Sequence, residues 1–145
     1  MPKLPDADEL TVFRYRRRVQ FAETDLAGIV HFSWMFRYME EAEHALWRAA
    51  GLSVAGRGSD LGWPRVLATF EFQNPLFFED EFDVVVRLED AGRRSLQYRH
   101  TIVRGETTIG SGLMTSVCAR KTPEGLQAID LPADIVDRLR GAMTG

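Results

Sequence analysis

The spacing of hydrophobic residues divides the chain into strand-like and helix-like segments. Between residues 13 and 21 apolar residues alternate with arginine and glutamine, which is the period-two pattern of a strand with one solvated face. Arg17 interrupts the apolar row of this strand. From Trp34 to Ala50 apolar residues recur at spacings of three and four, which predicts a long amphipathic helix. Ser33 is a candidate N-cap for this helix, and Gly51 is a candidate left-handed stop.

Four more strands are predicted beyond a glycine-rich loop at residues 51–65. Turn-forming residues separate the four strand-like runs, which cover residues 66–73, 81–89, 94–104 and 107–121. A short helix is expected at about residues 132–143, with Pro132 at its first helical position. This order of elements favours an α+β fold, in which one long helix lies against the inner face of an antiparallel sheet.

The size of the chain and of its helix sets limits on domains and assembly. A length of 145 residues fits one domain, which we read as residues 1–145 with a polar leader at about residues 1–11. One helix covers only part of one face of a five-stranded sheet, so the remainder is expected to pack on a second copy. We therefore expect a homodimer that assembles to a homotetramer.

Composition excludes several classes of function. Hydrophobic residues make up 45% and charged residues 27%, as in a soluble globular domain. The formal net charge of -3 provides no positive field for a polyanion, so no nucleic-acid partner is expected. No apolar run approaches the roughly 18 residues that cross a bilayer, and no export signal is visible, so we expect a cytoplasmic protein with no membrane association. The single Cys118 and three scattered histidines predict neither a disulfide nor a metal site.

Asp25 is the first candidate for chemistry. It lies between the first strand and the long helix, near the free N–H groups and partial positive charge expected at a helix N-terminus. Such a position keeps a carboxylate ionised, and the same N–H groups can stabilise an oxyanion. The alternative is that Asp25 only forms an Asx turn or caps the helix. Spacing alone leaves both interpretations open.

A longer motif around Asp25 resembles a known family. Residues 21–32, FAETDLAGIVHF, and residues 36–42, FRYMEEA, are similar to the signature of the hotdog-fold acyl-CoA thioesterases of the 4-hydroxybenzoyl-CoA thioesterase type. The order of elements agrees over residues 12–130, and residues 72–76 followed by Asp80 resemble the family's corner between strands. The resemblance implies a five-stranded antiparallel sheet wrapped around one long helix.

The same resemblance implies a reaction and a site. The reaction is hydrolysis of an acyl-CoA to the free acid and coenzyme A, with no metal and no organic cofactor. Asp25 matches the catalytic carboxylate, which acts as nucleophile or as general base on water. Gly28 matches a glycine that permits a tight turn, and Phe32 matches the position whose backbone N–H binds the thioester oxygen. Sites of this family form across a dimer interface, where a tunnel holds the pantetheine arm.

His31 and several residues outside the motif are weaker candidates. His31 is expected to orient substrate or water, or else to be a structural histidine at the helix entry. Phosphates of coenzyme A call for basic residues, and an acyl group calls for apolar walls. The candidates for substrate binding are Arg93, Arg94, Arg120 and Lys121 for the phosphates and Trp34 and Trp63 for the acyl group. For each of them the alternative is a solvated strand end or core packing.

Other polar residues are interpreted as structural. Glu40 and Glu41 are expected on a solvated helix face, although some hotdog thioesterases carry their catalytic carboxylate on the helix. His44 is expected in solvent, and His100 is expected to be a hydrogen-bonded histidine of the core or an interface. Cys118 is expected to be a small buried residue.

Two other functions remain open at this point. One is a non-catalytic module that binds an acyl-CoA or another small ligand, although a buried carboxylate without a task is costly. The other is a hotdog dehydratase or hydratase, which needs a histidine and an acidic residue facing one substrate. The His-rich, Gly-containing segment of those relatives is missing from this helix.

Overall fold

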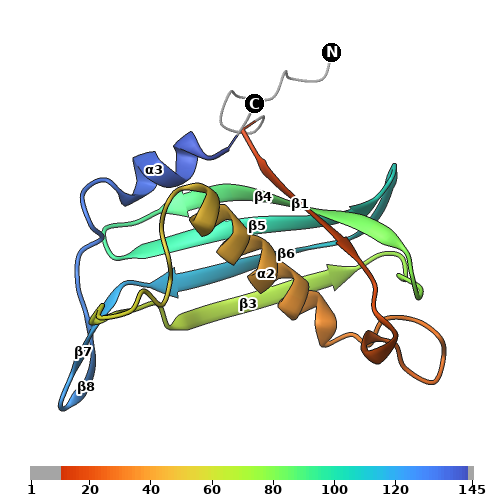
Figure 1. The fold of residues 1–145 in the computed structure, drawn as a ribbon, viewed down its shortest axis with the longest axis horizontal. Helices are drawn as coiled ribbons and strands as arrows, with labels where there is room; N and C mark the ends of the chain where they lie inside the picture. Colours follow the sequence, from red (N-terminus) through yellow and green to blue (C-terminus); the bar gives the residue numbers. More distant parts are fainter. Residues whose placement is uncertain (1–10, 144–145) are drawn as a thin grey trace.

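A five-stranded antiparallel sheet with a long helix across one face forms the body of the protein (Figure 1). The structure is a computed structural model that describes residues 11–143. The helix is α2 (Trp34–Ala49), and the strand order is β1-β4-β5-β6-β3. These strands are β1 (Phe13–Arg18), β3 (Arg65–Phe72), β4 (Glu81–Ala91), β5 (Ser95–Arg104) and β6 (Thr107–Val117). The predicted α+β class, antiparallel sheet and long helix are confirmed, and almost all of the predicted polar leader lies outside the described residues.

A smaller sheet was not predicted. It contains β2 (Leu61–Gly62), β7 (Ala119–Thr122) and β8 (Gly125–Ala128). The strand expected at residues 107–121 is wrong in its length, because the chain leaves the main sheet at Cys118. The Cys118 N–H donates to the carbonyl of Arg94 at 2.7 Å, and its carbonyl accepts from Ile129 at 3.0 Å. Cys118 itself is buried, as expected.

The C-terminal helix α3 (Ile135–Gly141) is shorter than predicted. It begins three residues after Pro132, which lies in the preceding turn, where its carbonyl accepts the N–H of Ile135 at 3.2 Å. Placing Pro132 at the first helical position was therefore wrong. Ile135 and Leu139 are buried and join this helix to the main core.

The main core lies between α2 and the inner face of the sheet. Each fully buried apolar side chain in such a core contributes about 1.5–3 kcal/mol to stability. The helix buries Met35, Tyr38, Ala42 and Leu46 against Phe82, Val84, Val86, Leu96, Tyr98 and Ile102 of the strands. Gly112 of β6 allows β3 to approach closely, because a Cβ there would lie 2.0 Å from the carbonyl oxygen of Thr69.

The two edges of the main sheet differ in character. The edge strand β1 carries exposed arginines that pair with acidic side chains of β4, including Arg16 with Glu81 at 2.9 Å. The opposite edge strand β3 exposes apolar side chains, with Val66 62% and Leu67 40% exposed. Within residues 11–143 no strand pairs with the outer edge of β3. Charged edges resist further pairing, so β3 is the edge suited to accept another strand.

Candidate active site

Asp25 lies in a small hairpin between β1 and α2. Thr24 and Val30 form an isolated antiparallel bridge at its base. The Asp25 N–H donates to the carbonyl of Ile29 at 2.8 Å, and the Gly28 N–H donates to the carbonyl of Asp25 at 3.0 Å. Gly28 has a φ of 81°, a left-handed conformation that favours glycine. The tight turn implied for Gly28 is therefore confirmed.

The Asp25 carboxylate is exposed, and only one of its two oxygens accepts a hydrogen bond. Its Oδ1 accepts the N–H of Ala27 at 2.8 Å, which is the Asx-turn contact. Within residues 11–143 no donor contacts the second oxygen, Oδ2. Asp25 precedes the first residue of α2 by nine positions and does not cap that helix. One carboxylate oxygen is thus held by the backbone while the other is open to a ligand.

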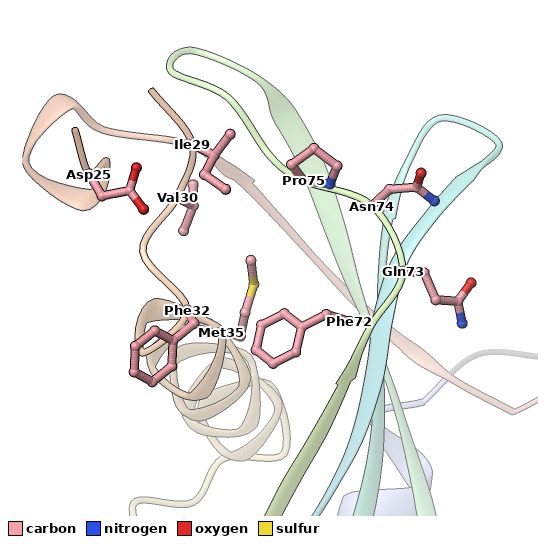
Figure 2. A pocket seen from close by; sticks show the side chains of 9 residues that line it. All are labelled: Asp25, Ile29, Val30, Phe32, Met35, Phe72, Gln73, Asn74 and Pro75. Atoms are coloured by element: carbon pink, nitrogen blue, oxygen red, sulfur yellow. The ribbon is translucent and has the colours of Figure 1, made fainter. Parts of the chain in front are cut away.

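A cavity of about 310 Å³ lies beside this carboxylate (Figure 2). It is lined by Asp25, Ile29, Val30, Phe32, Met35, Phe72, Gln73, Asn74 and Pro75. Figure 2 shows the rings of Phe32 and Phe72 on either side of Met35, while the side chains of Gln73 and Asn74 point away from Asp25. The segment before α2 and the corner after β3 therefore form apolar walls next to a single carboxylate.

The backbone of Phe32 supplies a free donor at this cavity. The neighbouring N–H groups are engaged: His31 donates to the carbonyl of Glu23 at 2.9 Å, and Trp34 donates to the carbonyl of His31 at 2.9 Å. For the N–H of Phe32, no acceptor lies within residues 11–143. A free N–H in the first turn before a helix is suited to bind a developing oxyanion.

A buried carboxylate, Glu23, underlies the hairpin and was not singled out from the sequence. It is 3% exposed and binds Arg17 through both oxygens at 2.6 and 2.5 Å. Burial raises the pKa of Glu23, but hydrogen bonds from Arg17, the Gln20 N–H and Tyr38 outweigh burial and lower it. Arg17 takes an inward position on β1. Its place in an otherwise apolar row of the sequence was the feature that could have indicated a buried charged partner.

His31 and Trp34 lie on a different side of the hairpin from this cavity. They line a second, larger hollow of about 800 Å³ that shares only Asp25 with the first. The Nδ1 of His31 lies 2.8 Å from the Ser33 hydroxyl, so Ser33 occupies the N-cap position without capping α2. Phe21, expected on the inner face of the first strand, is 75% exposed at this hollow.

Trp63 lines a third cavity, of about 300 Å³, beside the middle of α2, where Glu40, Glu43 and His44 line it. Its ring packs edge-on against Trp47 with centroids 4.9 Å apart. The cavity also contains Glu43, which is 3% exposed and lies 2.7 Å from Arg65. Burial raises the pKa of Glu43, while the charge of Arg65 opposes that rise. Within one chain Trp63 is therefore separated from Asp25.

Several charged residues of α2 are wholly or partly buried, whereas the sequence pattern predicts a solvated face. Glu43 is buried, and Glu41 accepts from Arg17 at 2.8 Å and from Tyr15 at 3.2 Å. His44 was expected in solvent, but it is half-buried beside Glu43. These residues face loops and strands distant in sequence, which periodicity does not register.

The basic candidates belong to the β4–β5 turn and to β7, which lie at the opposite end of the main sheet from the segment between β1 and α2 that contains Asp25 (Figure 1). Arg93 and Arg94, in the turn between β4 and β5, both bind Asp130, at 2.9 and 3.1 Å. Arg120 on β7 pairs with Asp60 at 3.3 Å, and Lys121 is its exposed neighbour. A single chain does not bring these four side chains to the Asp25 cavity.

His100 is buried, but its expected hydrogen bonds are absent. Neither ring nitrogen has a partner among the described residues. Burial of the ring and the positive charge of Arg65 lower the pKa of His100 to about 3, against a weaker opposing effect from the backbone of Met39. Across residues 11–143, no group of three His, Cys, Asp or Glu is placed to hold a metal ion, and no helix is long and apolar enough to span a membrane.

Comparison with known families matches residues 19–139 to the thioesterase-like superfamily. The chain belongs to this superfamily. A crystal structure of a hypothetical protein from Aquifex aeolicus superimposes on this thioesterase-like protein with a TM-score of 0.81 and 30% identity, covering 88% of this chain and 98% of the other. The fold is the hotdog fold, as the sequence motif implied.

Two enzymes are also similar over most of their length. The 4-hydroxybenzoyl-CoA thioesterase of Pseudomonas sp. (strain CBS-3) is 28% identical over 134 residues, which cover 84% of this chain and 93% of that enzyme. The 1,4-dihydroxy-2-naphthoyl-CoA hydrolase of Picosynechococcus sp. is 26% identical over 136 residues, covering 90% and 93%. Both names describe hydrolysis of an aromatic acyl-CoA thioester.

Proposed function

We propose that this thioesterase-like protein hydrolyses an acyl-CoA thioester to the free acid and coenzyme A, with Asp25 as the catalytic carboxylate. One observation carries the proposal: the half-free carboxylate of Asp25 and the residue with the unpaired N–H, Phe32, line the same apolar cavity. A thioester bound in this cavity would lie next to both a carboxylate and a residue with a free N–H donor for its oxygen. These are the two groups that acyl transfer needs.

Two routes use this arrangement. In the first, Asp25 Oδ2 attacks the carbonyl carbon, the C–S bond breaks, and the thiolate leaves and takes up a proton. Water then hydrolyses the acyl-aspartyl anhydride and restores the carboxylate. In the second, Asp25 removes a proton from water as the oxygen of that water attacks the same carbon. The C–S bond then breaks, and the leaving thiolate takes up the proton from Asp25. In both routes the Phe32 N–H stabilises the oxyanion, and neither route requires a metal or an organic cofactor.

An aromatic acyl group is the first substrate class to test. The walls of the cavity are apolar and include two phenyl rings, those of Phe32 and Phe72. Apolar walls with one or two fixed polar groups are typical of sites that bind the hydrophobic part of a ligand. The names of both similar enzymes specify hydroxylated aromatic acyl groups, which supports the same class for this chain.

The proposal includes a second copy of the chain at the β3 edge. Two β3 strands that pair antiparallel lie with the Phe72 end of one beside the Arg65 end of the other. The Asp25 cavity of one copy would then adjoin the end of its partner that carries Trp63, Arg120 and Lys121. This arrangement would let the aromatic and basic candidates serve the Asp25 of a neighbouring chain. We extend it to a homotetramer of two such dimers, and light scattering at micromolar concentration tests both assemblies.

A hydratase is the second candidate function. Asp25 and His31 line the same second hollow, so an acid and an imidazole face one space, as that reaction requires. The His31 Nδ1 is already engaged with the Ser33 hydroxyl, at 2.8 Å. Loss of enoyl absorbance from an enoyl-CoA in the presence of the protein would support this function over hydrolysis.

A screen of thiol release tests the proposed function. The purified protein is incubated with short, medium, long and aromatic acyl-CoAs, and free coenzyme A is detected with a thiol reagent. The proposal predicts protein-dependent release, fastest with an aromatic acyl group. Saturable binding of the same acyl-CoAs by calorimetry with no thiol release from any of them would contradict it and support a non-catalytic binding module.

A further inference from the structure

A buried charged network lies beneath the Asp25 hairpin, and neither proposed route uses it. Its centre is the Glu23 carboxylate, whose Oε1 accepts from Arg17 Nη1 at 2.6 Å, from the Tyr38 hydroxyl at 2.8 Å and from the Gln20 N–H at 2.8 Å. The Oε2 atom accepts from Arg17 Nη2 at 2.5 Å. Four donated hydrogen bonds hold this side chain in one place.

The network joins three elements of the fold. Arg17 belongs to β1 and Tyr38 to α2, while Glu23 belongs to the segment that leads into the hairpin. The Arg17 guanidinium also lies over the Tyr38 ring, 4.8 Å from its centre, and its Nε donates to Glu41 of α2 at 2.8 Å. Because a guanidinium presents its donors in a rigid planar fork, these contacts fix direction as well as distance.

The backbone of Glu23 holds the other arm of the hairpin. Its carbonyl accepts the N–H of His31 at 2.9 Å. Asp25 lies two residues after Glu23 on the outgoing arm, and Phe32 follows His31 on the returning arm. Glu23 is therefore one of the residues that join the segment with the carboxylate to the segment with the free N–H, together with the Thr24–Val30 bridge and the Asp25–Ile29 hydrogen bond, and it alone of these also binds β1 and α2 through its side chain.

We propose that Glu23 is a positioning residue that sets the placement of the Asp25 carboxylate relative to the Phe32 N–H. The inference rests on the proposed function, because it assigns those two groups to one reaction. A buried ion pair contributes little net stability compared with apolar packing, so stability is a poor reason for burying one here. Placement is a better reason, since an error of about 1 Å in a catalytic group can reduce the rate by roughly 10²-fold.

A double-mutant cycle on kcat tests the proposal. Glu23→Gln keeps the shape of the side chain but loses the charge that Arg17 requires. On the wild-type background we expect kcat to fall by about 10- to 100-fold while KM changes by less than about threefold, because placement is lost and substrate binding is not. On an Asp25→Asn background the same change should reduce the residual kcat by less than about threefold, since no carboxylate remains to be placed.

Two further variants separate positioning from folding. Leu139→Ala removes a buried contact of α3, far along the chain from the hairpin, and should lower the melting temperature without changing kcat at 25 °C. Arg17→Lys keeps the positive charge but loses the two-pronged contact, and should give a kcat between those of the wild type and Glu23→Gln. Arg17→Lys also carries the test if Glu23→Gln does not fold.

The outcomes distinguish this inference from the proposed function. If Asp25→Asn leaves thiol release unchanged, the proposed function fails. If Asp25→Asn abolishes most of the activity while folded Glu23→Gln and Arg17→Lys keep kcat within about threefold of wild type, only the positioning role fails. An equal loss of kcat from Glu23→Gln on both backgrounds would also overturn the positioning role, because that loss would not depend on Asp25.

Discussion

Mild acid should destabilise the protein through His100. The imidazole is buried in β5, where it lies opposite Val86 of β4 and Gly112 of β6 and has no hydrogen-bond partner among the described residues. Its pKa is lowered from 6.5 to about 3, first by burial and then by the charge of Arg65. The folded protein therefore binds this proton more weakly than the unfolded chain does. The contribution of His100 to the free energy of unfolding is therefore fully present above pH 6.5, where the ring is neutral in both states. It is lost as the pH falls from 6.5 towards 3.

The size of the effect follows from the difference in pKa. A pH of 5 is 1.5 units below the pKa of 6.5 that the imidazole has in the unfolded chain, so the imidazole is protonated there. In the folded protein it remains neutral at this pH. At 1.36 kcal/mol per unit, the free energy of unfolding should be about 2 kcal/mol lower at pH 5 than at pH 7.5 from this group alone.

Urea unfolding at pH 7.5 and pH 5.0 measures this difference. His100→Leu replaces the imidazole with an apolar side chain that needs no hydrogen-bond partner. Between pH 7.5 and pH 5.0 the free energy of unfolding of this variant should therefore fall by about 2 kcal/mol less than that of the wild type. Arg65, Tyr98 and Glu43 remain in both proteins, so their contributions cancel in the comparison. Equal losses in wild type and His100→Leu would refute the reasoning.

Three other substitutions test separate features. Phe32→Pro removes the free N–H and should lower kcat by roughly 10²- to 10³-fold, whereas Phe32→Ala keeps the donor and should retain most of kcat in the thiol-release assay. Trp63→Ala should cost about 3 kcal/mol in urea unfolding because the ring packs on Trp47, and in the proposed dimer it should raise the kcat/KM ratio of bulky to short acyl-CoAs by about tenfold. Gly112→Ala places a Cβ 2.0 Å from the Thr69 carbonyl and should displace β3, seen as a lower melting temperature and loss of the dimer by light scattering.

The main sheet and helix could be predicted because their residues alternate or recur with the period of the element. The run from Phe82 to Leu88 places every second residue in the core, and α2 buries residues three and four apart. The small sheet could not be predicted in this way, since β2 has two residues and β7 and β8 have four each. The end of β6 depends on Cys118 bonding to residues far along the chain, which no local pattern contains.

The candidate site was predictable only in its local part. Asp25, Gly28 and Phe32 are close in sequence, so one motif indicates all three. The buried charges were missed because periodicity assigns charged residues to the solvated face, whereas Glu43 is neutralised by Arg65 from another element. Of the buried charged groups, only Arg17 was visible in the sequence pattern, as a charged residue in an apolar row.

The central claim is that Asp25 carries out the hydrolysis, and the Asp25→Asn variant tests it most directly. Thiol release from the best acyl-CoA of the screen is compared between this variant and wild type, with melting temperatures measured on both. Because the carboxylate is exposed and makes one backbone contact, the melting temperature should change little. Turnover should fall by roughly 10²- to 10⁴-fold. Turnover within about threefold of wild type in a folded variant would contradict the account.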